Sequence, residues 1–149
     1  MATIRLPPDF REFLLLLSSE GIEYLLVGGY AVGYYGYPRS TGDMDIWIAA
    51  TPANAAALTR ALERFGFSAK TLSECLFLGE NKVVRMGVPP LCIDLLTSVS
   101  GVDFTDCYAH RTVAVIDGVE VNVVGLDHLK TNKWTIARSK DLDDLEHLP

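Results

Sequence analysis

Cysteine is scarce in this sequence and follows no spacing that forms a disulfide framework or a zinc site. The 149 residues contain three cysteines, Cys75, Cys92 and Cys107, an odd number without a CxxC pair. Small disulfide-stabilised domains use an even and dense set of cysteines, and structural zinc sites use paired Cys or His ligands. Both are excluded, and the sequence predicts a reducing compartment, the cytoplasm.

Long hydrophobic runs are also absent. The apolar stretch near the start, residues 13–17, is far shorter than the roughly 20 residues that cross a bilayer. We expect neither a signal peptide nor a membrane anchor. Because 49% of the residues are hydrophobic and no repeat is visible, we expect one domain, residues 1–149, with a core of its own.

Positive charge is in short supply as well. Thirteen Lys and Arg residues stand against nineteen Asp and Glu, which gives a formal net charge of -6. Such a protein repels a polyanion, so broad coating of nucleic acid is excluded. One exception is a basic group near the C-terminus: Lys130, Lys133, Arg138 and Lys140.

The hydrophobic periodicity predicts interleaved helices and strands, followed by hairpins. Expected helices cover 8–19, 31–35, 53–65, 103–109, 126–137 and 140–148, and expected strands cover 24–27, 45–48, 82–86, 91–96, 112–116 and 119–123. The order favours the α/β (α+β) class, with a mixed sheet flanked by helices and closed by C-terminal helices.

The segment Gly28–Ile48, GGYAVGYYGYPRSTGDMDIWI, is the most informative part of the chain. A helix N-terminus presents free amide hydrogens and a partial positive charge, and glycine lets an anion approach the backbone. Gly28 and Gly29 are therefore candidates to bind phosphate, although a tight turn between a strand and a helix explains the pair equally well.

Asp43 and Asp45 follow on the next expected strand. Side chains two residues apart on a strand point to the same face, so both carboxylates project toward one point. Like charges need a cation to lie together, and hard oxygen ligands suit Mg²⁺, with Mn²⁺ as an alternative. The pair predicts a site for a complex of metal and nucleotide.

A third carboxylate, Asp94, lies inside the apolar run LCIDLLTS. A buried charge is expensive unless it is paired or bound to a metal. With Asp94 beside Asp43 and Asp45, two metal ions roughly 3.5–4 Å apart can hold the attacking and leaving oxygens of a phosphoryl transfer. Asp94 is then also a candidate base for the acceptor hydroxyl.

These residues resemble the nucleotidyltransferase superfamily, which includes DNA polymerase beta. The resemblance lies in the glycine pair, the pattern R-x-T-x-D-x-D and the later lone aspartate, and it is nearest in motif to AbiEii-type toxins. It implies that Asp43, Asp45 and Asp94 are catalytic and bind two Mg²⁺ ions. The chain departs from many relatives at Tyr30, where they have serine.

The resemblance further implies transfer of a nucleoside monophosphate from a nucleoside triphosphate to an acceptor hydroxyl, with release of pyrophosphate. The expected nucleotide-binding residues are Gly28, Gly29, Arg39, Thr41, Lys133 and Arg138. Three acceptor classes stay open: a small molecule, a protein or an RNA. A partner protein or a second copy of the chain is a further candidate to complete the cleft.

Several alternatives stand beside this interpretation. Lys133 and Arg138 can instead be exposed helix cations that pair with Asp141, Asp143 or Asp144. Trp47 shares the face of Asp43 and Asp45 and is a candidate to stack on a base, or else a core residue. At the level of the whole chain, the alternative is a catalytically degenerate, antitoxin-like nucleotide-binding module that regulates a partner.

Overall fold

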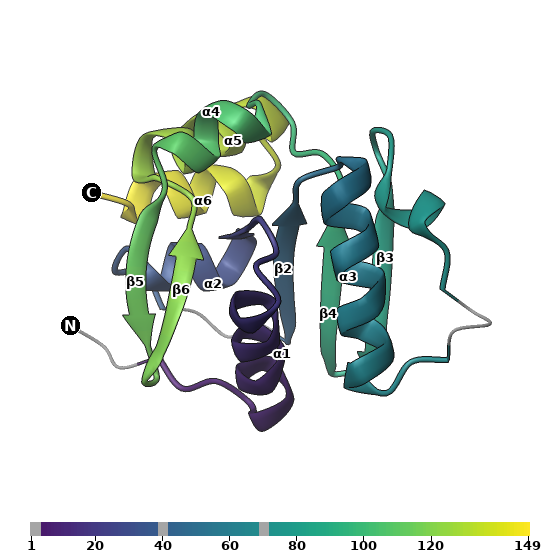
Figure 1. The fold of residues 1–149 in the computed structure, drawn as a ribbon. Helices are drawn as coiled ribbons and strands as arrows, with labels where there is room; N and C mark the ends of the chain where they lie inside the picture. Colours follow the sequence, from purple (N-terminus) through teal and green to yellow (C-terminus); the bar gives the residue numbers. More distant parts are fainter. Residues whose placement is uncertain (1–3, 39–41, 69–71) are drawn as a thin grey trace.

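The computed structural model describes residues 4–38, 42–68 and 72–149 (Figure 1). Its elements in chain order are α1 (Pro8–Ser19), β1 (Tyr24–Val27), α2 (Gly28–Tyr34), β2 (Asp43–Ile48), α3 (Pro52–Phe65), the 3-10 helix η1 (Glu74–Phe77), β3 (Val83–Val88), β4 (Leu91–Leu96), α4 (Phe104–Ala109), β5 (Thr112–Ile116), β6 (Val119–Val123), α5 (Leu126–Ile136) and α6 (Ser139–His147). None of these helices is long and apolar enough to span a bilayer.

The expected elements are confirmed, with shifts of a few residues at their ends. The largest shift is at α2, which begins at Gly28 instead of residue 31. The sequence analysis missed η1, a single short turn whose start is capped by the Ser73 hydroxyl, which accepts from the Cys75 amide. Short 3-10 turns have too few residues to show a periodicity.

The strands form one mixed sheet in the order β3-β4-β2-β1-β6-β5. Strand β2 runs parallel to β4, and β1 runs parallel to β6, while the remaining neighbours are antiparallel. Helices α1 and α3 lie across the near face in Figure 1, and α2 lies behind the sheet. The predicted fold class, a mixed sheet flanked by helices, is confirmed.

Helices α1 and α3 cover the apolar face of the sheet. Phe13 of α1 packs edge to face against Phe65 of α3, with ring centroids 5.3 Å apart. Met86 of β3 and Ile93 of β4 face the same side, because they line a pocket together with residues of both helices. Their strand neighbours Arg85 and Asp94 therefore face the opposite side.

Strand β2 shows the same division. Met44, Ile46 and Ile48 are fully buried on one face, and the alternating residues Asp43 and Asp45 lie on the other. Thr51 caps the following helix, since its hydroxyl accepts from the Asn54 amide at 3.3 Å. The sheet thus has an apolar face under α1 and α3 and an opposite face that holds the carboxylates.

Candidate metal-nucleotide site

The pairing of β2 with β4 brings the three predicted carboxylates onto one face of two adjacent strands. Asp45 lies directly opposite Asp94 in the parallel register, and Asp43 lies opposite Cys92, two residues before Asp94. In-register side chains on neighbouring parallel strands point the same way. Asp94 is therefore a neighbour of Asp45, although β3, α3 and η1 separate the two in sequence.

Gly28 lies against the carboxylate of Asp45. Val27, the last residue of β1, pairs with Asp45, and the chain then turns into α2 with Gly28 at a φ of +67°. A Cβ atom at Gly28 would lie 2.2 Å from Asp45 Oδ2, well inside van der Waals contact. Only glycine allows both this backbone conformation and this approach. The absence of a side chain at Gly28 thus leaves room for the Asp45 carboxylate directly beside the backbone.

Asp45 has an unusual electrostatic environment. Within the described residues its side chain makes no hydrogen bond and no ion pair. Burial, followed by the neighbouring charges of Asp94 and Asp43, raises the pKa of Asp45 to about 6, and the positive charges of Lys140 and Lys133 oppose this rise. Within the part of the chain that the structure describes, the negative charge on Asp45 therefore has no direct counter-ion.

Arg85 of β3 pairs with the other two carboxylates. Its Nε and Nη2 atoms donate to the two oxygens of Asp94 at 2.9 and 3.0 Å, and Nη2 also donates to Asp43 Oδ2 at 3.1 Å. Arg85 is not among the site residues predicted from the sequence. The hairpin register contains the information, because Val88 pairs with Leu91 across the turn and places Arg85 opposite Asp94.

The donor set is the one that Mg²⁺ prefers, three carboxylates on one face. Across residues 4–38, 42–68 and 72–149, however, no group of three or more His, Cys, Asp or Glu side chains is already arranged to hold a metal ion. Arg85 contacts both oxygens of Asp94 and Oδ2 of Asp43, and among the described residues nothing contacts the oxygens of Asp45. The residues fit a divalent cation chemically once the guanidinium has moved.

A polar pocket of about 210 Å³ opens beside Asp45. It is lined by Val27, Gly28, Gly29, Asp45, Leu96, Ser98, Val99, Ser100, Asn132, Lys133, Ile136, Arg138 and Lys140. Four of the predicted site residues, Gly28, Gly29, Lys133 and Arg138, therefore line one space with Asp45. The sequence analysis did not select Lys140, Asn132, Ser98 or Ser100, although it placed Lys140 in the C-terminal basic group.

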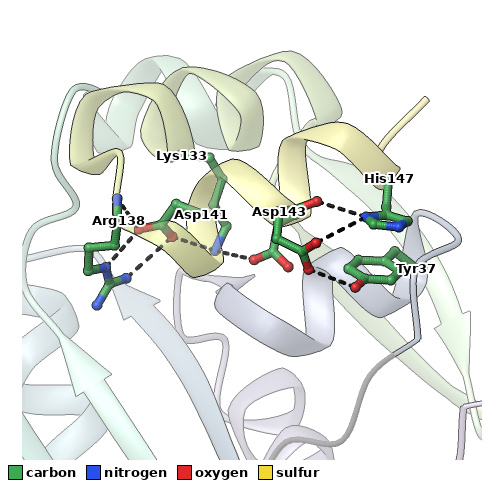
Figure 2. Close-up of polar contacts among 7 residues, drawn as sticks. Tyr37, Lys133, Arg138, Asp141, Asp143 and His147 are labelled. Carbon is green, nitrogen blue, oxygen red and sulfur yellow. Dashed lines mark hydrogen bonds and ion pairs between the residues drawn. The ribbon is translucent and has the colours of Figure 1, made fainter.

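Lys133 is buried in an ion-pair network between α5 and α6 (Figure 2). Its amino group lies 3.1 Å from Asp141 Oδ1 and 3.0 Å from Asp144 Oδ2, and both carboxylates are fully buried. The interpretation of Lys133 as an exposed cation was wrong, whereas its pairing with Asp141 and Asp144 is confirmed. These two partners neutralise much of its charge before any phosphate is bound.

Arg138 joins the same network at the start of α6. Its Nε donates to Asp141 Oδ2 at 2.7 Å, and its backbone N–H donates to the same oxygen at 3.1 Å. Burial by itself would raise the pKa of Asp141, but the hydrogen bonds from Arg138 and Lys133 outweigh it and lower the pKa to about 2. Unlike Lys133, Arg138 keeps about half of its side chain exposed.

A second contact ties α6 to the segment after α2. The Tyr37 hydroxyl donates to Asp143 Oδ2 at 2.7 Å, and its ring stacks on His147 with centroids 3.9 Å apart (Figure 2). Residue 37 lies shortly before the R-x-T-x-D-x-D motif. Of the predicted nucleotide-binding residues, Arg39 and Thr41 lie outside the described residues.

Two aromatic residues beside the site belong to the core. Trp47 is 2% exposed and packs edge to face against Phe104 of α4, at 5.2 Å between centroids. The hypothesis that Trp47 stacks on a base was therefore wrong, because α4 covers its ring. Tyr30, at the position where many relatives have serine, packs against Phe10 of α1.

No protein-family model matches the chain, and no curated protein matches it in sequence. Solved structures do match. A protein from Thermotoga maritima assigned as a nucleotidyltransferase has a TM-score of 0.64 at 14% identity, covering 95% of this chain and 93% of that one. The antibiotic-resistance factor ANT(2'')-Ia, in complex with adenylyl-2''-tobramycin, has a TM-score of 0.59 at 11% identity, covering 92% and 83%.

A third match is an antigenic nucleotidyltransferase-like protein from Paracoccidioides brasiliensis, with a TM-score of 0.54 at 19% identity, covering 93% of this chain and 73% of that one. Identities this low establish a shared architecture and leave activity open. They do not distinguish AbiEii-type proteins from other branches. The mixed sheet and flanking helices of this chain form a nucleotidyltransferase fold.

Proposed function

We propose that the chain is a magnesium-dependent nucleotidyltransferase that moves a nucleoside monophosphate from a nucleoside triphosphate to an acceptor hydroxyl. The observation that supports this most strongly is the register of Asp45 against Asp94, with Gly28 pressed against Asp45 and a cationic pocket beside it. The nucleotidyltransferase fold supports the same assignment.

In this proposal Asp43, Asp45 and Asp94 bind the divalent cations. When bound, Mg²⁺ (or Mn²⁺) neutralises the charge that develops on the phosphate oxygens. The acceptor oxygen forms a bond to the α-phosphorus, the bond from that phosphorus to the bridging oxygen of the β-phosphate breaks, and pyrophosphate leaves. Asp94 takes the proton of the acceptor hydroxyl.

The triphosphate occupies the pocket beside Asp45. Backbone amides of Gly28 and Gly29 and the side chains of Arg138 and Lys140 are the proposed phosphate contacts. Lys140 is exposed, lines the pocket, and among the described residues is the cation with the largest effect on Asp45. Lys133 lines the same pocket, but because it is held by Asp141 and Asp144 we assign it a weaker phosphate contact and a main role in positioning α6.

The test is an acceptor screen with α-labelled ATP, GTP, CTP and UTP in the presence of Mg²⁺. Candidate acceptors are small polyhydroxyl compounds including aminoglycosides, because one structure of the same fold holds adenylyl-tobramycin, together with proteins and RNA. We expect a labelled product and pyrophosphate with the wild-type protein and neither with Asp45→Asn. Magnesium-dependent binding of nucleotide without product for any acceptor would instead support a regulatory module.

A further inference from the structure

Arg85 is the one described cation in direct contact with the carboxylates of the site. It reaches them from the edge strand β3, and its guanidinium donates to both oxygens of Asp94 and to one oxygen of Asp43. Two parallel hydrogen bonds from a guanidinium to one carboxylate are the strongest arrangement available to such a pair. Asp94, at 7% exposure, is thereby compensated without a metal ion.

The guanidinium draws on the same carboxylate oxygens that a metal ion would use. Mg²⁺ and Mn²⁺ need carboxylate oxygens as inner ligands, and the oxygens of Asp94 already accept from Arg85. Two positive groups at one carboxylate also repel each other. About half of the Arg85 side chain is exposed, so the side chain has room to swing outward.

We propose that Arg85 competes with the divalent cation for Asp43 and Asp94, so that metal binding requires the guanidinium to leave them. This inference rests on the proposed function, because it takes these carboxylates as metal ligands. Arg85 therefore lowers the affinity for free metal ions. Once displaced, its guanidinium lies at the edge of the site as a donor for an anionic ligand.

The test is calorimetric titration of MnCl₂ into the metal-free protein at pH 7, comparing wild type with Arg85→Met. Methionine has similar length but neither donates hydrogen bonds nor offers a hard oxygen to the metal. Arg60→Met is the matched control, because Arg60 is exposed on α3 and its loss changes the net charge equally. We expect Arg85→Met to bind Mn²⁺ on the order of threefold to tenfold more tightly than both other proteins, the range of a partly exposed ion pair.

Arg85→Lys is a second variant, in case Asp94 without a partner prevents Arg85→Met from folding. Lysine keeps the charge but cannot form the two parallel hydrogen bonds to Asp94. We therefore expect a gain in Mn²⁺ affinity over wild type that is smaller than the gain in Arg85→Met. Equal or weaker Mn²⁺ binding by the folded Arg85 variants, with wild type still binding, would overturn the competition and leave the proposed function intact. No Mn²⁺ binding by any of these proteins would overturn both.

Discussion

Two groups of charged side chains border the pocket, and they differ in how well their charges are matched. In the α5–α6 network, Lys133 and Arg138 face Asp141 and Asp144, and these two carboxylates are fully buried. In the strand cluster, the described residues place the Arg85 guanidinium on Asp43 and Asp94 and give Asp45 no direct partner.

We interpret the α5–α6 network as structural and the strand cluster as part of the proposed site. The buried amino group of Lys133 and the buried carboxylates of Asp141 and Asp144 fix one arrangement of the two helices, since removing Lys133 leaves unpaired charge in the core. In the strand cluster, burial and then the charges of Asp94 and Asp43 raise the pKa of Asp45. This cluster leaves negative charge open to a pocket, which is where a cation would bind. The sequence analysis assigned members of both groups to the nucleotide, and the structure gives them different environments.

The largest expected effect concerns the strand cluster. Asp45→Asn should lower nucleotidyl transfer about a thousandfold or more, because it removes a metal ligand and its charge. The same change should raise the free energy of unfolding of the metal-free protein at pH 7 by roughly 1–3 kcal/mol. The folded state raises the pKa of Asp45, so ionised Asp45 destabilises the fold at this pH.

Asp127→Asn is the control, an exposed carboxylate at the start of α5 outside the pocket. Transfer assays and chemical denaturation with a chelator present measure both quantities. Full activity in Asp45→Asn would place the chemistry elsewhere, and a loss of stability would show that Asp45 belongs to the structural group.

The α5–α6 network should respond in the opposite way. Lys133→Met should lower the free energy of unfolding by about 3 kcal/mol, because Asp141 and Asp144 lose their shared buried cation. Lys130→Met, three residues earlier in α5 and less buried, should change it by less than about 1 kcal/mol. Equal effects of the two changes in urea denaturation would contradict the structural role of Lys133.

Acid should protonate Asp45 in the pocket, with its pKa of about 6, well before it weakens this network. The folded state lowers the pKa of Asp141 to about 2, below its ordinary value, so its stabilisation is present above about pH 4 and is lost as the pH falls toward 2. We expect Asp141 to account for about 2 kcal/mol of this loss. The measurement is the free energy of unfolding as a function of pH, compared between wild type and Asp141→Asn. Parallel curves for the two proteins over this range would rule the contribution out.

The smallest expected effect separates backbone strain from the contact with Asp45. Gly28 and Gly21 have φ values of +67° and +66°, but a Cβ at Gly28 meets Asp45 whereas one at Gly21 meets nothing within 4 Å. In both alanine variants the left-handed backbone conformation should lower the free energy of unfolding by about 1 kcal/mol. In Gly28→Ala the contact with Asp45 should lower it by at least about 1 kcal/mol more. Only Gly28→Ala should impair nucleotidyl transfer. If the two variants lose equal stability and equal transfer activity, Gly28 does not position Asp45.

Much of the fold could be predicted from the sequence because its signals are local. Alternation along β2 predicts the common face of Asp43 and Asp45, and helical periodicity predicts α3 to within one residue of its start. Arg85 was equally accessible, since the short turn at Pro89–Pro90 sets the register that pairs it with Asp94.

Contacts between distant segments could not be predicted in this way. Nothing local pairs β2 with β4, so the neighbourhood of Asp45 and Asp94 was predicted only indirectly, from the apolar setting of Asp94 and from the resemblance. Alternation places Trp47 on the acidic face but contains no information that α4 covers it. The burial of Lys133 likewise depends on how α6 packs against α5, and this tertiary packing has no local signal in the sequence.

The central claim, a site for metal and nucleotide at Asp45, is tested most directly by titrating ATP, GTP, CTP and UTP calorimetrically into wild type and Asp45→Asn, with and without Mg²⁺. We predict that at least one nucleotide binds the wild-type protein only when Mg²⁺ is present, and that this binding is lost in folded Asp45→Asn. Nucleotide binding that is independent of both Mg²⁺ and Asp45, or no binding at all, would contradict the claim.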